Sequence, residues 1–224
     1  MRPARAHSPT PEARAAVVAH LRQRRREGRP VVIDLGCGAH KTPEAFGVDA
    51  APLPGVDLVH DLLSLPYPLP GDCADQVVLY HVLEHFADPL PVLEEVWRIA
   101  RPGSRVLIRT PHYSGVYAWK DPTHRRAFTS ESFHYFGENG YSYYTHARFR
   151  VVSVRLKYFM EEHLWPRPHR AWARAVQWVL DRHPTFGERF LASLVGGIDE
   201  LQVTLEAVKP PPAAPTAKRE VLFP

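Results

Sequence analysis

The stretch "VVIDLGCGAHK", residues 31–41, decides the expected fold, because an apolar run broken only by Asp34 leads straight into a Gly-x-Gly turn. A short apolar run that ends at glycine is typical of a strand buried in a parallel sheet. Gly36 and Gly38 permit backbone conformations that other residues rarely adopt, and they let a ligand approach the main chain. The stretch therefore predicts a first strand that ends at a ligand-binding loop.

Strand and helix patterns alternate on both sides of this stretch. Upstream, residues 11–26 have the spacing of an amphipathic helix, with Thr10 as its cap and Pro11 at its first position. Further strands are expected at 46–50, 56–62, 75–82, 104–111, 148–158 and 199–209. Further helices are expected from Asp88-Pro89 to Ala100, near 130–136, at 168–182 and at 185–195. This order predicts an α/β fold with a Rossmann-like, mostly parallel sheet and helices on both faces.

A length of 224 residues with 45% hydrophobic content suits one large domain. We expect an N-terminal helix and basic segment over 1–30, a single domain over 31–209 and a disordered, proline-rich tail over 210–224. Within the domain, residues 112–198 would contain the insertions on the substrate side.

Charge is segregated along the chain. Residues 1–30 carry a net charge of +6, residues 31–111 carry −6 and residues 112–174 carry +5. An acidic part beside a basic, histidine-rich part suggests two ligands of opposite character. No apolar run approaches the length of a membrane span, and the two cysteines make neither a disulfide framework nor a metal cluster. We therefore expect a cytoplasmic protein with no membrane partner and no bound metal.

Polar residues follow each of the first four expected strands. Asp34, Asp49, Asp61 and the pair Tyr80-His81 stand at the strand ends, which meet at one edge of a parallel sheet. Such a set predicts a ligand site at that edge. A dinucleotide fingerprint would need a third glycine where the chain has Lys41, and no Tyr-x-x-x-Lys pair is present. Both observations count against an NAD-dependent oxidoreductase or epimerase.

At this point the sequence resembles a known family, the class I S-adenosylmethionine-dependent methyltransferases of the methyltransferase type 11 kind. The residues that carry the resemblance are "VVIDLGCG", "GVDA" and "VHDLLSLPYPLPGDCADQVVLYHVLEHFADPLPVLEEVWRIARPGSRVLIRTP". It covers roughly residues 31–135. The resemblance implies a seven-stranded sheet with an antiparallel last strand, and S-adenosyl-L-methionine as the cofactor.

The resemblance also implies a role for each strand-end residue. Gly36 and Gly38 would let the backbone approach the methionine part of the cofactor, and Asp34 would help to hold its ammonium group. Asp49 resembles the acid that accepts both ribose hydroxyls, and Asp61 resembles the contact to the adenine amino group. The resemblance places five neighbouring residues against the cofactor, the last two of them near its reactive methyl: Cys37, Ala50, Leu62, His81 and Val82.

The chain departs from the family in one segment. Only ten residues separate Gly38 from Asp49, where the family usually has a full helix, and Pro43 argues against one. Either the first helix is reduced to a turn, or the second strand lies elsewhere.

Methyl transfer to a hydroxyl or an amine needs a group that removes a proton. His112 directly follows the fifth expected strand, and Asp121 and His124 lie in "KDPTHRR", so a histidine base oriented by a carboxylate is predicted from these three residues. Substrate contacts are expected from aromatic and basic side chains nearby: Tyr113, Trp119, Arg125 and Arg126.

A metal-binding alternative uses the same segment. His112, Asp121 and His124 could ligate a metal together with one residue of 161–163, which holds Glu161, Glu162 and His163. The spacing matches no compact motif, so we expect no metal.

We therefore predict a methyltransferase that acts on a small molecule, which could be anionic, at a hydroxyl oxygen. Nucleic-acid methylation is disfavoured, because "YHVLEH" stands where an Asn- or Asp-Pro-Pro-Tyr element would be needed. Four alternatives stay open: a lyase or cyclase that uses the same cofactor, a metal-assisted methyltransferase, an oxidoreductase, and a binding protein without turnover. The chain could also form a homodimer.

Overall fold

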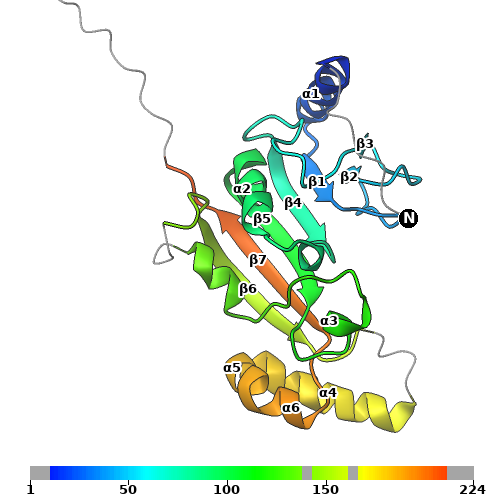
Figure 1. Cartoon of the computed structure of the whole chain (residues 1–224), viewed down its shortest axis with the longest axis vertical. Coiled ribbons are helices and arrows are strands. Elements are labelled where there is room, and N and C mark those ends of the chain that lie inside the picture. Colours follow the sequence, from blue (N-terminus) through cyan, green and yellow to red (C-terminus); the bar gives the residue numbers. More distant parts are fainter. Residues whose placement is uncertain (1–10, 138–142, 161–165, 211–224) are drawn as a thin grey trace, which may run out of the picture.

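The computed structural model describes residues 11–137, 143–160 and 166–210. Its centre is a seven-stranded sheet with the strand order β3-β2-β1-β4-β5-β7-β6 (Figure 1). The strands are β1 Val32–Leu35, β2 Phe46–Asp49, β3 Leu58–Val59, β4 Ala74–Tyr80, β5 Ala100–Pro111, β6 Phe149–Lys157 and β7 Glu200–Ala207. The first five strands pair in parallel, whereas β7 runs antiparallel to both β5 and β6. The predicted fold class is thereby confirmed.

Strand order reverses between β1 and β4. From β1 the chain proceeds to β2 and β3 on one side, and from β4 it proceeds to β5 on the other. Ligands of open α/β sheets bind beyond the carboxyl ends of the strands at such a reversal. The residues that follow β1 and β4 are therefore the ones to inspect.

The helical segments are α1 Pro11–Arg26, η1 Leu83–His85, α2 Leu90–Ile99, α3 Tyr117–Lys120, η2 Ser132–Phe136, α4 Arg167–Arg182, α5 Pro184–Phe186, η4 Gly187–Leu191 and α6 Ala192–Leu194. Figure 1 shows α2 across one face of β4 and β5. Val106 and Ile108 of β5 are buried, as are Val92 and Val96 of α2. Burial of such aliphatic side chains stabilises the fold by about 1.5–3 kcal/mol each. At the end of the sheet, α4 lies beside β6 (Figure 1).

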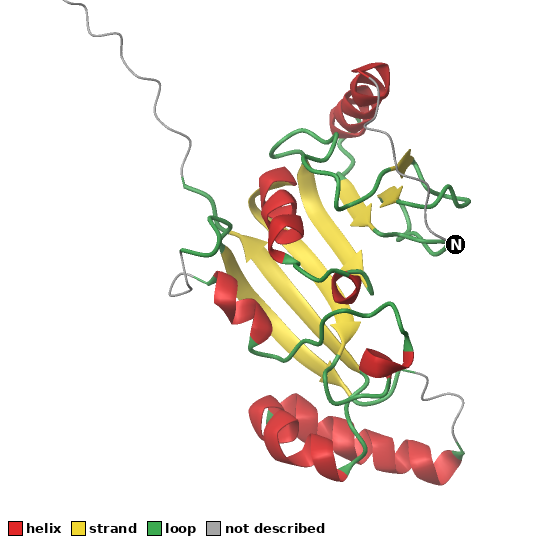
Figure 2. Cartoon of the chain, in the orientation of Figure 1, coloured by secondary structure: helices red, strands yellow, loops and turns green. Residues whose placement is uncertain are grey.

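Two expected elements differ in extent. The expected strand 56–62 forms only as β3, and residues 60–73 are turns, bends and irregular backbone. Ala100 was expected on the apolar face of a helix, but it caps α2 in an extended conformation and begins β5. Between β1 and β2 there is no helix, so the first helix of the family is reduced to a turn and Asp49 does end the second strand (Figure 2).

The segment 184–194 is helical throughout, close to the expected 185–195, and its middle part Gly187–Leu191 is a π-helix. A π-bulge is often found at functional sites. This segment and α4 lie beyond the carboxyl ends of β5 and β6, on the same side of the sheet as the end of β4 (Figure 1). Across the described residues, no helix has the length and apolar character needed to cross a membrane.

Candidate functional site

The Gly-x-Gly turn follows β1 directly. Gly36 has a φ of +71°, and a Cβ added there would lie 2.3 Å from Cγ2 of Val82. Gly36 is therefore required by its backbone conformation and by the close approach of the residues after β4. Gly38 also has a positive φ, but a Cβ added there would meet no atom within 4 Å. The turn thus presents open space beside the main chain at Gly38.

Two strand-end acids hold this loop in place. Oδ2 of Asp49 accepts a hydrogen bond of 2.8 Å from the amide of Gly38, and Oδ1 accepts one from the amide of Ala51. Oδ2 of Asp34 accepts a bond of 2.7 Å from the amide of Thr42, and burial raises the pKa of this carboxyl. Each carboxylate oxygen keeps a second lone pair, so Asp49 can still accept hydroxyl donors from a ligand.

The other residues expected at the cofactor line the same edge in different ways. Leu62 is buried in the core, and Oδ1 of Asp61 accepts a hydrogen bond of 2.9 Å from the amide of Leu63. Burial raises the pKa of the Cys37 thiol to about 11, so this side chain is neutral at physiological pH. Ala50, next to Asp49, is half-buried.

His81, the first residue after β4, is held between two buried acids. Its Nε2 lies 3.0 Å from Oε2 of Glu200, and its Nδ1 lies 3.4 Å from Oε1 of Glu84. The hydrogen bond to Glu200 and the contact with Glu84 raise the pKa of His81 to about 9, against the effect of burial. His81 is therefore positively charged at neutral pH, and the two carboxylates leave this group with a net negative charge.

Glu84 is 1% exposed, and it lies in η1. Its Oε2 accepts a hydrogen bond of 3.1 Å from the hydroxyl of Thr110, at the end of β5. Its Oε1 is buried and has no hydrogen-bond partner among the described residues, although Nδ1 of His81 approaches it at 3.4 Å. A buried carboxylate oxygen without a donor is energetically costly.

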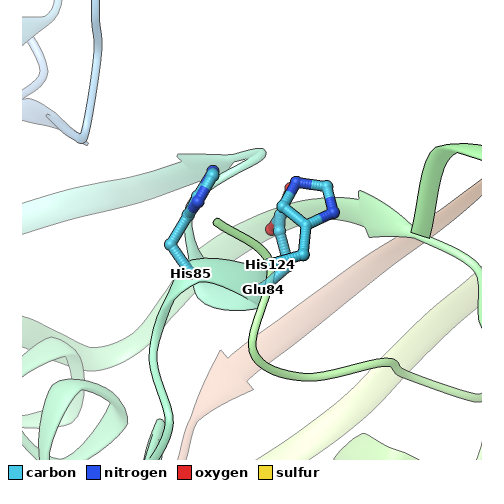
Figure 3. Close-up of side chains that lie close together, drawn as sticks. All are labelled: Glu84, His85 and His124. Carbon is cyan, nitrogen blue, oxygen red and sulfur yellow. The ribbon is translucent and has the colours of Figure 1, made fainter. Parts of the chain in front are cut away.

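The backbone of Glu84 brings a distant loop to this position. Its carbonyl accepts hydrogen bonds from the amides of Arg125 and Arg126, at 2.7 and 3.1 Å. As a result, His124 lies beside Glu84 and His85, and one ligand atom of each of the three lies within 4.8 Å of the others. Figure 3 shows the two imidazoles with the carboxyl behind them. We call these three residues, Glu84, His85 and His124, the Glu84 cluster.

The three residues expected to form a base do not come together. His112 is fully buried, with Nε2 3.1 Å from Oε1 of Glu188 and Nδ1 2.8 Å from Oγ of Ser114. Asp121 and His124 are joined to each other, with 3.9 Å between Oδ2 and Nε2, and His124 belongs to the Glu84 cluster. The three residues therefore do not form one group, because the side chain of His112 points into the interior, toward the helical segment 184–194. Glu161, Glu162 and His163 lie outside the described residues.

The expected substrate residues lie on the same side of the sheet. Trp119 is 70% exposed, and its indole donates a hydrogen bond to the carbonyl of Tyr113. Nε of Arg126 donates to the carbonyl of Ala87, and Arg125 is exposed. A cavity of about 370 Å³ is lined by Tyr113, Thr129, Ser130, Glu131, Thr185, Glu188 and Arg189.

Sequence reasoning missed four acids and histidines of this edge: Glu84, His85, Glu188 and Glu200. Glu84 and His85 stand in the motif "HVLEH", which was already associated with the cofactor, so their position at the edge was a usable signal. Glu188 and Glu200 reach the site from far along the chain, and no local pattern marks them.

Comparisons with known proteins agree with this geometry. A family model described as "Methyltransferase domain" matches residues 10–177. A probable S-adenosylmethionine-dependent methyltransferase of Mycolicibacterium smegmatis is 32% identical over 98 residues, which is 36% of this chain and 38% of the relative. The chain thus spans well under half the length of that curated relative.

Two solved structures share the fold. A SAM dependent methyltransferase from Archaeoglobus fulgidus superposes with a TM-score of 0.52 at 19% identity, covering 86% of this chain and 94% of that one. The [4+2]-cyclase SpnF superposes with a TM-score of 0.50 at 15% identity, covering 81% and 75%. Likeness at such low identity establishes the fold and no more.

Proposed function

The chain belongs to the family of methyltransferase domains, and from this premise we propose that it transfers a methyl group from S-adenosylmethionine to a hydroxyl oxygen of a small molecule. The observation that carries the proposal is the open space at Gly38, in the turn that begins at Gly36, where the strand order reverses. A ligand bound there reaches the ends of β1, β2 and β4 together.

The strand-end residues support a specific orientation of the cofactor. The open space at Gly38 accommodates the methionine part, and Asp34, in the strand that leads into this turn, attracts its ammonium group. Asp49 accepts the ribose hydroxyls with its remaining lone pairs. Asp61 and Leu62, after β3, contact the adenine.

Charge near the reactive methyl also suits this cofactor. His81 and Val82 adjoin the Gly36 turn, and a sulfonium placed beside them is cationic. Imidazolium repulsion from His81 is outweighed by the carboxylates of Glu84 and Glu200, which both contact His81. Before any metal ion binds, a net negative charge therefore lies at the edge where the sulfonium is proposed to bind.

We propose that the Glu84 cluster, rather than His112, removes the proton from the acceptor hydroxyl. A general base must lie within hydrogen-bond reach of the acceptor, and His112 is fully buried with both ring nitrogens engaged. His85 is exposed, and the side chain of His124 is 11% exposed. His112 then acts as a positioning residue that ties the end of β5 to Glu188.

The acceptor is proposed to be small and anionic. A cavity of about 370 Å³ beside Tyr113 has the size of a small-molecule site. It is lined by one basic side chain, Arg189, and two acidic ones, Glu131 and Glu188, so the proposed negative charge of the acceptor rests on Arg125. Trp119 and Arg125 are both exposed on the same side of the sheet and can contact an acceptor.

Calorimetric titration with S-adenosylhomocysteine and, separately, with NAD tests the cofactor. We expect micromolar binding of S-adenosylhomocysteine to the wild type and at least ~10-fold weaker binding to Asp49→Asn, because one acceptor oxygen is replaced by a donor. Asp72→Asn is the matched control, since Asp72 is exposed and pairs with Lys209. Binding of NAD alone contradicts the proposal.

The reaction itself needs a separate measurement, because the same fold is found in a [4+2]-cyclase. Incubation of the protein and candidate acceptors with methyl-labelled cofactor, followed by mass spectrometry, detects transfer of the label. A converted acceptor without label would favour the cyclase or lyase alternative.

A further inference from the structure

The Glu84 cluster contains a buried acceptor that receives no hydrogen bond from the part of the chain that the structure describes. Oε2 of Glu84 receives a hydrogen bond from Thr110, whereas Oε1 is buried without one. The nearest described cation is His81, whose Nδ1 lies 3.4 Å from Oε1. Buried charges are normally paired and hydrogen-bonded or coordinate a metal, so this oxygen is suited to a further positive ligand.

The tautomer of His85 is set by its neighbours. Thr123 donates its hydroxyl hydrogen to Oδ1 of Asp121 at 2.7 Å, because a carboxylate can only accept. Oγ1 of Thr123 must then accept the hydrogen bond of 2.9 Å from Nδ1 of His85. In the neutral imidazole, Nε2 of His85 is left with its lone pair exposed.

The tautomer of His124 is set in the same way. Its Nδ1 lies 3.2 Å from the carbonyl oxygen of Ala118, which can only accept. Nε2 therefore carries the lone pair, and it is 3.9 Å from Oδ2 of Asp121, longer than a hydrogen bond. An imidazole that donates from one nitrogen to a carbonyl or hydroxyl and offers the other is the arrangement typical of a metal ligand.

We propose that the Glu84 cluster binds one divalent transition-metal ion through Oε1 of Glu84 and Nε2 of His85 and His124. Two imidazoles and one carboxylate suit Zn²⁺, Co²⁺, Mn²⁺ or Fe²⁺ rather than Ca²⁺. Three protein ligands leave open positions for a substrate oxygen.

This inference rests on the proposed function for its role, because Glu84 and His85 follow His81 and Val82 at the cofactor edge. If the ion is bound, His85 and His124 serve as its ligands rather than as the base, and an acceptor hydroxyl held by the ion would lose its proton to solvent more readily. The oxygen then forms a bond to the methyl carbon while the carbon–sulfur bond of the sulfonium breaks. The electron pair of that bond stays on sulfur, which yields the methylated acceptor and S-adenosylhomocysteine.

The test uses the untagged full chain, stripped of metal with a chelator and titrated with Co²⁺ by calorimetry and visible absorption. We expect one equivalent to bind and to give the absorption bands of Co²⁺ with nitrogen and oxygen ligands. His124→Gln and Glu84→Gln should bind far more weakly. Thr123→Val keeps the shape of the side chain but removes the acceptor for His85, and it should weaken binding about 10-fold.

Two controls separate a lost site from a lost fold. His134→Gln makes the same chemical change at an exposed histidine of η2 and should bind Co²⁺ as the wild type does. S-adenosylhomocysteine is titrated into every variant without metal. No saturable Co²⁺ binding by the wild type, or equal binding by His124→Gln, overturns the metal site. S-adenosylhomocysteine binding without Co²⁺ binding leaves the proposed function standing, whereas the reverse result removes the proposed function and keeps the site.

Discussion

Nε2 of His112 lies 3.1 Å from Oε1 of Glu188, in a buried pair that joins the end of β5 to the π-helical turn of residues 187–191. The carboxylate also accepts the amide of Ser130, at 3.0 Å, and its hydroxyl. Glu188 therefore connects three segments that lie beyond the sheet: the turn after β5, the loop before η2 and its own π-helical turn. The segments that carry the substrate-side residues depend on it.

Glu188→Gln should lower the free energy of unfolding by about 2–4 kcal/mol, because the amide places a donor against groups that already donate. Urea denaturation of the wild type and the variant measures the loss. Glu131→Gln is the control, since Glu131 is exposed near the same loop and should change the free energy by less than about 0.5 kcal/mol. An equal, small effect of both substitutions would show that the buried pair does not stabilise the fold.

The contribution of Glu188 should depend on pH. Burial raises the pKa of this carboxyl, but hydrogen bonds from His112 and Ser130 outweigh it, so the pKa in the folded protein lies below the ordinary 4.5. The unfolded chain thus takes up the proton first, and the stabilisation is present above pH 4.5 and is lost as pH falls through the folded pKa. The difference in the free energy of unfolding between wild type and Glu188→Gln, measured by urea denaturation, should become smaller from pH 7 to pH 3. A constant difference would contradict the lowered pKa.

Gly36 and Gly38 should respond differently to alanine. Gly36→Ala combines a positive φ with a Cβ 2.3 Å from Val82, and we expect a loss of about 3 kcal/mol in folding free energy. Gly38→Ala has room for its Cβ and should cost about 1–2 kcal/mol, yet it fills the space proposed for the cofactor.

Thermal unfolding and titration with S-adenosylhomocysteine distinguish these two losses. We expect Gly38→Ala to stay folded at 25 °C and to bind S-adenosylhomocysteine at least ~10-fold more weakly, which corresponds to 1.4 kcal/mol. Unchanged affinity in a folded Gly38→Ala would place the cofactor elsewhere on the sheet edge.

Much of the fold could be predicted from the sequence because its signals are local. The apolar run before Gly36 and the alternating residues of β6 and β7 identify strands without knowledge of their partners. The length of β3 was overestimated. The strand does not include Asp57, whose side chain accepts hydrogen bonds from the amide of Gly47 and from Lys41. That contact is made across strands and has no local signature.

The cofactor-binding residues stay a prediction, whereas the three residues expected to form a base lie apart for a similar reason. Val106, Ile108 and Thr110 are buried at every second position of β5, and His112 continues this series. The alternation therefore indicated a side chain that points into the interior, although the position of His112 directly after the strand suggested a place at the ligand edge. Its partner Glu188 is 76 residues away. Long-range pairs of this kind depend on tertiary packing, which a single sequence does not specify.

Substitutions of Arg125 and Arg126 should have different effects, the first on substrate binding and the second on the stability of the loop. Both amides donate to the carbonyl of Glu84. Of the two side chains, only that of Arg126 makes a hydrogen bond to a described residue, of 2.6 Å from Nε to the carbonyl of Ala87. With an acceptor identified by label transfer, Arg125→Gln should raise KM about 10-fold and leave kcat within about twofold, because it removes uniform binding of an anionic group. Arg126→Gln should instead lower the free energy of unfolding by about 1 kcal/mol.

Wild-type KM should also rise with ionic strength, and this dependence should weaken in Arg125→Gln. If KM is insensitive to both salt and the loss of Arg125, the acceptor is not held by its negative charge at this position.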